Sequence, residues 1–567
     1  MRNGALGFGL LGAVLLAANV NIHAQESSES DAYGYVLEEV IVRAQKRDQT
    51  LQEVPISVNA ISGENIREGQ ITGMNDVALE TPNFTFTQFN VGEPQYFIRG
   101  IGNTLDSAGS DPAVATFIDE VYVGRGGGTA TDLFDIDRVE VLRGPQGTLF
   151  GKNVAGGAIS IFTRRPSQEF EGKFGLTVGN YNLRTVQGLV NGGLSDTISG
   201  KFSFSKRDRD GYVDNVTDGQ EYHDEDNLSL RGQLLFTPSD SLEILFGLDW
   251  TEDDLAGNCR NVNNLDLNNP LGLAPFWPPV IAATTGGDIR KCASSAGVHA
   301  GLDRNYQQRE TGGALLHVDK TLDNSVFTSI TSYRDTDYSW SEDLAGMPWG
   351  QTPFNLIDSA MENSDQFSQE FRWTSSGGGT FDWLAGAFYM KENIYREERF
   401  VGAFFAPVAA LGFNLLNGDV NFTQDNETTS TAVFGQIDYH INENLTWSFG
   451  GRYARDEKDI AQALINLEDP AFDSAVLSAI LGFPVELVIL GIPANGPGEL
   501  LAFVATGNPG ALNFPYSTTA SESWSDFLPS TSLSWQFADD SFLYLMAAEG
   551  YKSGAFVSST TTAGACA

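Results

Sequence analysis

The sequence predicts an all-β transmembrane β-barrel that follows a smaller N-terminal domain. Three observations support this: an export-type start, a long region in which apolar and polar residues alternate, and strand connections that alternate between short and long. A period of two is typical of a strand with one apolar and one polar face. Transmembrane barrels carry short turns at one end and long loops at the other, whereas a soluble all-β protein has no reason to separate them. The alternative is a propeller or solenoid, but no 40-residue blade repeat is found.

The first 24 residues have the pattern of a signal peptide. Arg2 supplies the positive start, residues 5–18 are small and apolar, and Ala24 provides the small residue before a cleavage that would leave Gln25 first. A single membrane anchor is the alternative, but about 14 apolar residues are too few to span a bilayer. We therefore expect an exported protein without a membrane-spanning helix.

Composition excludes several classes of function. The 567 residues carry a formal net charge of -39, which is unsuited to binding nucleic-acid phosphates. Three cysteines and five histidines, none in an HExxH spacing, predict no zinc site, no other metal site and no cofactor. No serine, histidine and acid constellation can be placed, which makes a hydrolase the least favoured interpretation.

The alternating region contains about thirteen predicted strands. Leu242, Ile244 and Phe246 face one way, for example, while Glu243 faces the other. The predicted strand centres lie near residues 174, 187, 201, 232, 246, 314, 329, 368, 386, 434, 449, 530 and 545. Short turns follow the even-numbered strands. Long loops follow most odd-numbered strands, at about 208–226, 253–306, 338–360, 394–425 and 457–521.

Four sequence blocks stand before the strands. They are LEEVIVRAQKRDQTLQEVPISVNAIS at 37–62, FIRGIG at 97–102, FIDEVYVGR at 117–125 and DRVEVLRGPQGTLFGKNVAGGAISIFTRRP at 137–166. Glycines in the last block permit tight turns that a side chain would block. A phosphate loop is rejected there, because Gln146 and Asn153 stand where that loop needs glycine and a hydroxyl residue.

In order and spacing, the four blocks resemble the plug domain of TonB-dependent outer-membrane receptors. The resemblance implies a 22-stranded barrel with an N-terminal α+β plug domain in its lumen. About 13 of those strands fall within this chain, so we expect a barrel that is incomplete at its C-terminus. The segment AEGYKSGAF at 548–556 resembles an internal barrel motif of the family. The plug-motif residues are Arg99, Gly100, Arg143, Gly144, Pro145, Gly147, Gly151, Gly156 and Gly157.

The resemblance also implies a division of the chain into four parts. They are a signal peptide (1–24), a flexible leader with a TonB box (25–47), the plug domain (48–166) and the incomplete barrel domain (167–567). Residues 25–37 are too few to form the extra periplasmic domain of receptors that also signal, so transport without a signalling arm is expected.

The segment that resembles the TonB box comprises Glu38, Glu39, Val40, Ile41, Val42, Arg43 and Ala44. Its central β-forming residues could add as a strand to the exposed sheet edge of a partner. The alternative is that it forms the first strand of the plug, and the two roles could alternate.

Ligand contacts are predicted at Arg125, Gln95 and Tyr122. For Arg99 and Arg125, support of the plug fold through buried hydrogen bonds is the alternative role. Three apolar outer loops, at 271–283, 401–416 and 471–505, could form a wall for an amphiphilic ligand or pack on each other. Cys259 and Cys292 are expected to form a disulfide, with two free thiols as the alternative, and Cys566 has no obvious partner.

The resemblance implies a TonB-dependent active transporter, a multi-pass β-barrel in the outer membrane of a Gram-negative bacterium. Such transport makes and breaks no bond, and with this interpretation we predict that the protein is not an enzyme. A ferric siderophore is the default cargo; carbohydrate, cobalamin, haem or aromatic compounds could take its place. A passive porin, a non-functional truncated receptor and a soluble adhesin are competing interpretations of the whole chain. The expected partners are TonB with its inner-membrane energising complex, an extracellular small-molecule ligand and outer-membrane lipid. We expect a monomer that binds no nucleic acid.

Overall fold

The computed structural model describes residues 41–52, 54–90, 92–103, 107–129, 133–259, 291–292, 294, 304–344, 354–404, 417–466, 516–538 and 541–556. The chain divides into two compact units, Met1–Glu39 and Val40–Ala567, and every described residue belongs to the second. The predicted signal peptide, residues 38–40, most of the three apolar outer loops and Cys566 lie outside the described residues.

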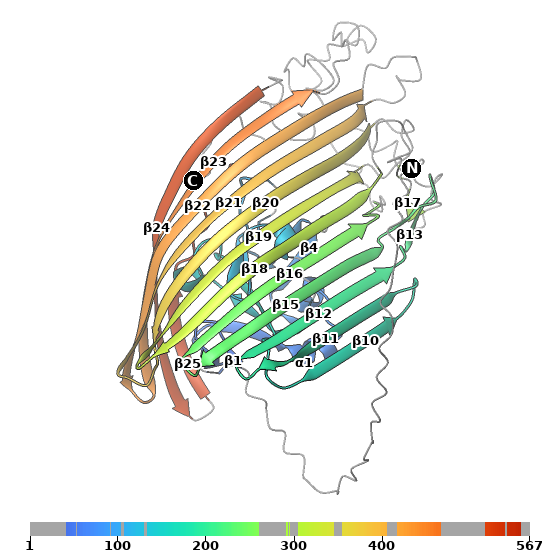
Figure 1. Cartoon of the computed structure of the whole chain (residues 1–567). Coiled ribbons are helices and arrows are strands. Elements are labelled where there is room, and N and C mark those ends of the chain that lie inside the picture. Colours follow the sequence, from blue (N-terminus) through green and yellow to red (C-terminus); the bar gives the residue numbers. More distant parts are fainter. Residues whose placement is uncertain are drawn as a thin grey trace, which may run out of the picture. The chain divides into compact units, whose positions relative to one another are not determined.

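An antiparallel sheet of 13 strands forms the larger part of the described unit (Figure 1). Each strand pairs with its neighbour in the chain order, and the pairings run from β10 to β25. In order, the strands are β10 (Glu171–Val178), β11 (Arg184–Ser195), β12 (Ile198–Arg209), β15 (Glu225–Ser239), β16 (Leu242–Leu255), β18 (Tyr306–Leu322), β19 (Ser325–Asp343), β20 (Phe354–Ser375), β21 (Phe381–Phe404), β22 (Asn417–Asn442), β23 (Leu445–Asn466), β24 (Tyr516–Ala538) and β25 (Ser541–Ala548). The predicted barrel sheet is therefore confirmed, and each predicted strand centre falls within one of these strands.

The side chains of this sheet alternate between an apolar outer face and a polar inner face. Leu248 and Ile437 are 50% and 51% exposed, whereas Gln233 and Gln436 of the opposite face are buried. Burying polar side chains and exposing apolar ones is unfavourable in water, but it is the pattern of a barrel wall in lipid. Aromatic side chains cluster at the outer face near the short turns, as in an interface belt; they include Trp373, Phe381, Trp447 and Trp535.

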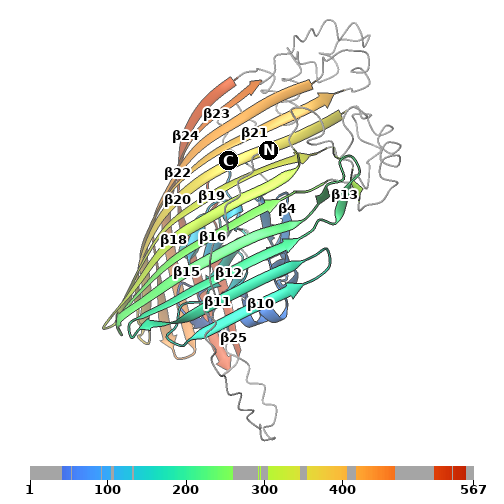
Figure 2. The ribbon, with the colours of Figure 1, turned by 45° about the vertical axis from the view of Figure 1, so that its right-hand side comes forward.

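The two ends of the strands differ, as Figure 2 shows. Turns such as the one between Leu322 and Ser325 join the strands at one end, and the long connections leave from the other. Strands of up to 26 residues exceed the ~10 that cross a bilayer. Near the long connections the outer face is acidic, with Glu310 placed between Glu252 and Asp337 on the neighbouring strands. The apolar band therefore lies closer to the short turns.

The smaller domain contains a mixed five-stranded sheet in the order β3-β8-β9-β6-β7. β3 (Ser57–Ser62), β8 (Ile136–Arg143), β9 (Gly157–Thr163), β6 (Val114–Ile118) and β7 (Val121–Val123) make it up, and β6 and β9 run parallel. The other elements are the hairpins β1 (Ile41–Val42) with β2 (Gln49–Thr50) and β4 (Phe84–Gln88) with β5 (Pro94–Ile98), and the helices α1 (Gly63–Glu68), α2 (Met74–Glu80), α3 (Gly126–Thr129) and α4 (Gly147–Phe150).

Apolar residues spaced two apart in β8 and β9 build the core of this domain. Val139, Val141, Ile159 and Ile161 are all fully buried in one apolar cluster. Gly157 must remain without a side chain, because its φ is +150° and a Cβ would lie 2.1 Å from the Leu142 carbonyl oxygen. The glycine-rich block is thus needed for close packing of β8 against β9.

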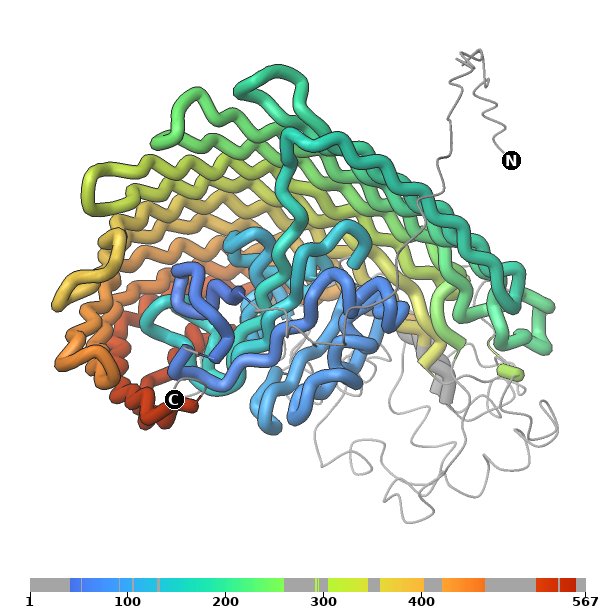
Figure 3. Tube along the Cα trace, turned by 90° about the horizontal axis from the view of Figure 1, so that it is seen from below, coloured from blue at the N-terminus to red at the C-terminus, as the bar shows by residue number. Residues whose placement is uncertain are grey.

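The inner face of the large sheet curves around the smaller domain, which Figure 3 shows from the short-turn end. Contacts join the two directly: Thr148 Oγ1 donates to the Leu528 carbonyl at 3.2 Å, and Gln366 Nε2 donates to the Tyr122 carbonyl at 2.7 Å. A second apolar cluster combines Phe117 and Leu149 of the smaller domain with Leu384 and Phe434 of the wall. We call the smaller domain, residues 41–166, the plug.

A three-stranded sheet, in the order β14-β13-β17, lies among the long connections. It consists of β13 (Val213–Asn215), β14 (Glu221–Tyr222) and β17 (Lys291–Cys292). A disulfide joins Cys259 and Cys292, whose Cα atoms are 6.0 Å apart. It therefore ties β17 to the chain that leaves β16.

No helix within the described ranges is long and apolar enough to cross a membrane.

Candidate functional site

The described part of the predicted TonB box is packed into the plug as its first strand. Ile41 and Val42 pair with Thr50 and Gln49 of β2. Val42 and Ala44 are 0% and 1% exposed, whereas Ile41 remains 43% exposed. The segment thus has one buried side and one accessible end, and a partner strand could reach only its accessible end without moving the plug.

Arg43 connects this strand to three carboxylates. Its backbone N–H donates to Glu140 Oε1 at 2.9 Å, and its guanidinium contacts Asp48 at 2.5 Å and Glu120 at 3.1 Å. Burial disfavours the charged form of Arg43, but Asp48 and Glu120 more than compensate and raise its pKa. Removing the strand from the plug would therefore break several charge-assisted hydrogen bonds.

Glu120 links the same cluster to the wall. Arg372 of β20 donates to Glu120 Oε2 at 2.5 Å, and both side chains are 5% exposed. Burial alone would raise the pKa of the Glu120 carboxyl, but the cations around it, Arg372 first, hold that pKa well below its ordinary value. Glu120 therefore bridges the first strand of the plug and the barrel through Arg43 and Arg372.

Two more basic residues of the β1–β2 connection reach the wall. Lys46 is 8% exposed, and its ammonium lies 3.8 Å from Glu370 and about 5 Å above the Phe150 ring. Arg47 forms an ion pair of 2.8 Å with Asp438 of β22. We call Arg43, Lys46, Arg47 and Glu120, with their wall partners Glu370, Arg372 and Asp438, the hairpin cluster.

A second buried cluster lies deeper along the wall. Asp111 of the plug is 3.1 Å from the ammonium of Lys458 on β23 and 3.7 Å from that of Lys152. Burial would raise the pKa of Asp111, but the two ammonium groups reverse this and lower it. This cluster holds the plug to β23, which is the next strand of the sheet after β22.

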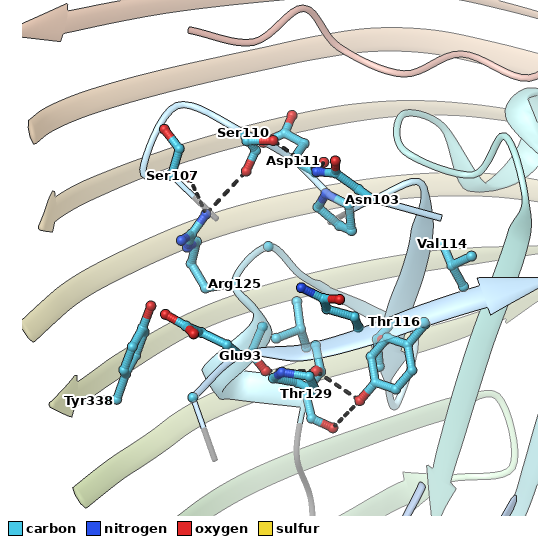
Figure 4. Close-up of a pocket in the computed structure, with 18 residues that line it drawn as sticks. Glu93, Asn103, Ser107, Ser110, Asp111, Val114, Thr116, Arg125, Thr129 and Tyr338 are labelled. Atoms are coloured by element: carbon cyan, nitrogen blue, oxygen red, sulfur yellow. Dashed lines mark hydrogen bonds between the residues drawn. The ribbon is translucent and has the colours of Figure 1, made fainter. Parts of the chain in front are cut away.

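A small cavity lies where the plug faces the long connections, and Figure 4 shows its lining. Gln95 and Arg125, two of the three residues predicted to contact ligand, line it together with Glu93 and Tyr338. Its volume of about 80 Å³ holds only a few water molecules, far less than a small-molecule site needs. Tyr122 is not part of it: this tyrosine is 6% exposed and accepts a hydrogen bond from Asn153.

Arg125 is engaged by the protein itself. Its guanidinium makes a bidentate contact with Glu362 of β20, at 2.7 and 2.6 Å. It also donates to the carbonyl oxygens of Ser107 and Ser110, as Figure 4 shows. These contacts favour support of the plug fold over ligand contact as the role of this side chain. A ligand would contact Arg125 only after displacing Glu362.

Arg396 of β21, which was not predicted, forms the centre of a neighbouring network. It is 1% exposed and contacts Glu93 at 3.2 Å and the hydroxyl of Tyr338 at 2.8 Å. Trp340 donates to the same Glu93 oxygen at 3.2 Å. The sequence signal for Arg396 was a charged residue on the inward face of a strand. Its partner Glu93 could not be predicted in this way, because it is 303 residues away in the chain.

The plug-motif residues are used for turns and packing. Arg99 and Gly100 adopt positive φ angles of 53° and 79°, and Gly144 and Gly151 adopt 104° and 91°. Arg143 donates to the Pro82 carbonyl at 3.3 Å. Pro145 precedes α4, which begins at Gly147, and Gly156 precedes β9. A Cβ on Gly147 would lie 2.6 Å from the Glu549 carbonyl oxygen, and one on Gly156 would lie 2.9 Å from that of Ile101. These contacts support the plug and its seat on the wall.

Family models match both parts of this arrangement. Residues 50–158 match the TonB-dependent receptor plug domain, and residues 250–565, more than half of the chain, match the TonB-dependent receptor-like β-barrel. The chain belongs to the TonB-dependent receptor family. It is therefore an outer-membrane β-barrel protein of the Gram-negative type, in a family of receptors and transporters.

Two relatives show how distant the matched receptors are in sequence. The pesticin receptor of Yersinia pestis is 23% identical over 470 residues, which cover 79% of this chain and 59% of that protein. The ferripyoverdine receptor of Pseudomonas aeruginosa is 24% identical over 250 residues, covering 44% and 29%. This chain thus spans less than two thirds of the length of these relatives.

Solved structures support the fold. The ferric yersiniabactin uptake receptor of Yersinia pestis has a TM-score of 0.66 at 19% identity, covering 88% of this chain and 65% of that one. The ferric-catecholate import receptor of E. coli, in its open form, has a TM-score of 0.59 at 13% identity, covering 89% and 71%. Within the described residues, His, Cys, Asp and Glu do not form a group of three that could hold a metal ion.

Proposed function

We propose that this receptor takes up a ferric siderophore across the outer membrane, with energy delivered through TonB. The observation that carries the proposal is the seating of the plug: its first strand and its barrel contacts are made through ion pairs that a pull on the strand would break in turn. The named relatives supply the cargo class, because several are receptors for ferric siderophores.

The proposed sequence of events follows from the geometry of the hairpin cluster. A partner strand pairs with the leader at the accessible end of β1, where backbone hydrogen bonds can carry a force. The force removes Arg43 from Glu120, and Glu120 then loses one of its two cationic partners. Lys46 and Arg47 follow because they belong to the same short connection, and the contact of the plug with β20 and β22 weakens.

The experiment compares two substitutions at one position. Ile41→Pro removes a backbone N–H and restricts the chain, whereas Ile41→Ala keeps the backbone; because Ile41 is half exposed, either costs little packing. We expect cells with Ile41→Pro to bind a siderophore loaded with radioactive iron at their surface but to lose its energy-dependent uptake. Ile41→Ala should retain uptake.

Two competing functions are distinguished by the same assay. A passive pore would give uptake that is unaffected by Ile41→Pro and by collapse of the proton-motive force. Cobalamin is the second cargo candidate, because the vitamin B12 transporter of Vibrio vulnificus is 26% identical over 277 residues. If cells take up labelled cobalamin but none of a panel of siderophores, the cargo is cobalamin and the proposed mechanism is unchanged.

A further inference from the structure

A large cavity lies between the plug and the inner face of β10, β11 and β12. Its volume is about 580 Å³, within the range of small-molecule sites and several times that of the cavity at Arg125. On the plug side it is lined by α1, the connection that follows it and residues 133–136. On the wall side it is lined by polar residues of the three strands, among them Thr177, Thr185 and Gln187.

The charge of this cavity is opposite to that of the chain. Four cationic side chains line it, against the carboxylates of Asp76 and Asp135, although the chain has a net charge of -39. The four are Arg67, Arg164, Lys173 and Arg207. An excess of one sign of charge in a cleft raises the local concentration of ligands of the other sign.

Both carboxylates in the lining have hydrogen-bond or ion-pair partners, but only Asp135 has a cationic one. Asp135 pairs with Lys201 at 2.5 Å, and Asp76 accepts hydrogen bonds from the backbone and hydroxyl of Thr72 at 2.8 and 3.1 Å. Arg164 and Lys173 share a single carboxylate, Glu171. Arg67 is exposed and forms no ion pair with the described residues. Arg207 pairs with Glu225, and Asp76 keeps its negative charge because its Thr72 partners are neutral. The lining therefore keeps a small positive excess, which comes from Arg67 and from the two cations that share Glu171.

The side of the plug that faces β20, β22 and β23 is joined to the wall by buried ion pairs. There the hairpin cluster, the Asp111 cluster and the Arg125–Glu362 pair join the plug to β20, β22 and β23, and the small space beside Tyr122 and Arg452 measures about 20 Å³. A molecule passing on that side would have to break buried ion pairs. On the β10–β12 side the cavity already supplies part of the space, and a movement of the plug would open the rest.

We propose that this cavity binds anions and is the route by which an anionic cargo passes between the plug and the wall. The route rests on the proposed uptake function, whereas the anion site does not. The ligand class is a small carboxylate-, phosphate- or sulfonate-bearing molecule, or a metal complex with net negative charge. The guanidinium and ammonium groups of the lining would repel cationic solutes and would not attract neutral ones.

The anion site is tested by the labelling of a single cysteine. Thr185→Cys places a thiol in the lining, opposite Arg207 in the strand register, in a chain that also carries Cys566→Ser. The two probes are an anionic sulfonatoethyl and a cationic trimethylammonioethyl methanethiosulfonate. Ser376→Cys, in an exposed short turn, gives the intrinsic rate ratio of the two reagents.

Relative to Ser376→Cys, we expect the anionic reagent to be favoured at Thr185→Cys by at least ~5-fold at low salt. The preference should shrink with Arg67→Gln and further with Arg67→Glu, neither of which breaks an ion pair among the described residues. An equal ratio at the two positions, or a preference that these variants leave unchanged, would overturn the anion site.

The route is tested in cells with ferric yersiniabactin, the ligand named for the structurally similar receptor. Modification of Thr185→Cys with a bulky maleimide should reduce uptake by at least ~10-fold while surface binding persists, because the reagent occupies the cavity. The same modification of Ser376→Cys should leave uptake unchanged. Full uptake by modified Thr185→Cys would refute the route. If the unmodified chain takes up neither this nor any other siderophore, the proposed function and the route fall together, and the labelling ratio still decides the anion site.

Discussion

At the residue scale, Glu120 is the side chain that links the first strand of the plug to the barrel wall. It is nearly buried between Arg43 of the first strand and Arg372 of the wall. The loss of one member of a buried ion network leaves charges without partners, which costs more than the pair itself contributes. Exposed pairs such as Arg138 with Asp137, whose carboxylate is 51% exposed, contribute little.

Glu120→Gln should therefore destabilise the seated plug by about 3–5 kcal/mol. The measurement is the urea concentration at which the plug becomes sensitive to protease in detergent-solubilised receptor. Asp137→Asn is the matched control, and it should lower the stability of the seated plug, derived from that concentration, by less than about 1 kcal/mol. Equal shifts in the two variants would contradict the role given to Glu120.

Asp111 should make the stability of the seated plug depend on pH. Its folded pKa lies below the ordinary value of ~3.9, so its contribution to stability is complete above that value. It is lost as the pH falls below about 4 toward the folded pKa. Protease protection of the plug should decline in that range, and Asp111→Asn should show a lower but flatter profile. A decline that begins near pH 7, or one that Asp111→Asn leaves unchanged in shape, would contradict this assignment.

At the scale of elements, the strands were predictable and the clusters were not. The period-two pattern located the strands because lipid on one face and polar contacts on the other constrain every second residue. The pairing of Arg396 with Glu93, or of Arg372 with Glu120, depends on how the plug is seated, and no local sequence pattern reveals contacts between residues so far apart in the chain. Of the three predicted ligand contacts, Gln95 and Arg125 line one cavity, whereas Tyr122 lies outside it and its hydroxyl accepts a hydrogen bond from Asn153.

The disulfide between Cys259 and Cys292 stabilises the sheet of β13, β14 and β17. It closes a loop over a separation of 33 residues, for which loop-closure entropy gives about 3–4 kcal/mol. Replacing both cysteines with serine should make this sheet the first site of proteolysis in intact cells, while the heat-modifiable migration of the barrel on gels persists. Unchanged cleavage would show that the sheet is held without the disulfide.

At the scale of the whole molecule, the account requires that the outer face of the sheet lies in lipid. Leu248 is half exposed on that face, and an arginine in the apolar band should cost about 2–4 kcal/mol. Leu248→Arg should therefore lower the yield of folded barrel in membranes, whereas the apolar Leu248→Phe should not. An arginine tolerated as well as phenylalanine would place this face in water.

The central claim is that the plug sits inside the wall as described and must move for cargo to pass. An ideal Cβ on Gly128 lies 3.2 Å from the Thr336 hydroxyl oxygen, and its nearest neighbour, the Val123 Cγ1 methyl at 2.8 Å, belongs to a side chain that must shift slightly. We therefore expect Gly128→Cys with Thr336→Cys to join plug and barrel by a disulfide. The most direct measurement is siderophore uptake by cells that carry this pair, before and after reduction. We predict that the oxidised pair binds ligand but does not take it up, that reductant restores uptake, and that neither single cysteine has this effect. A pair that cross-links fully and still transports at the normal rate would contradict the account.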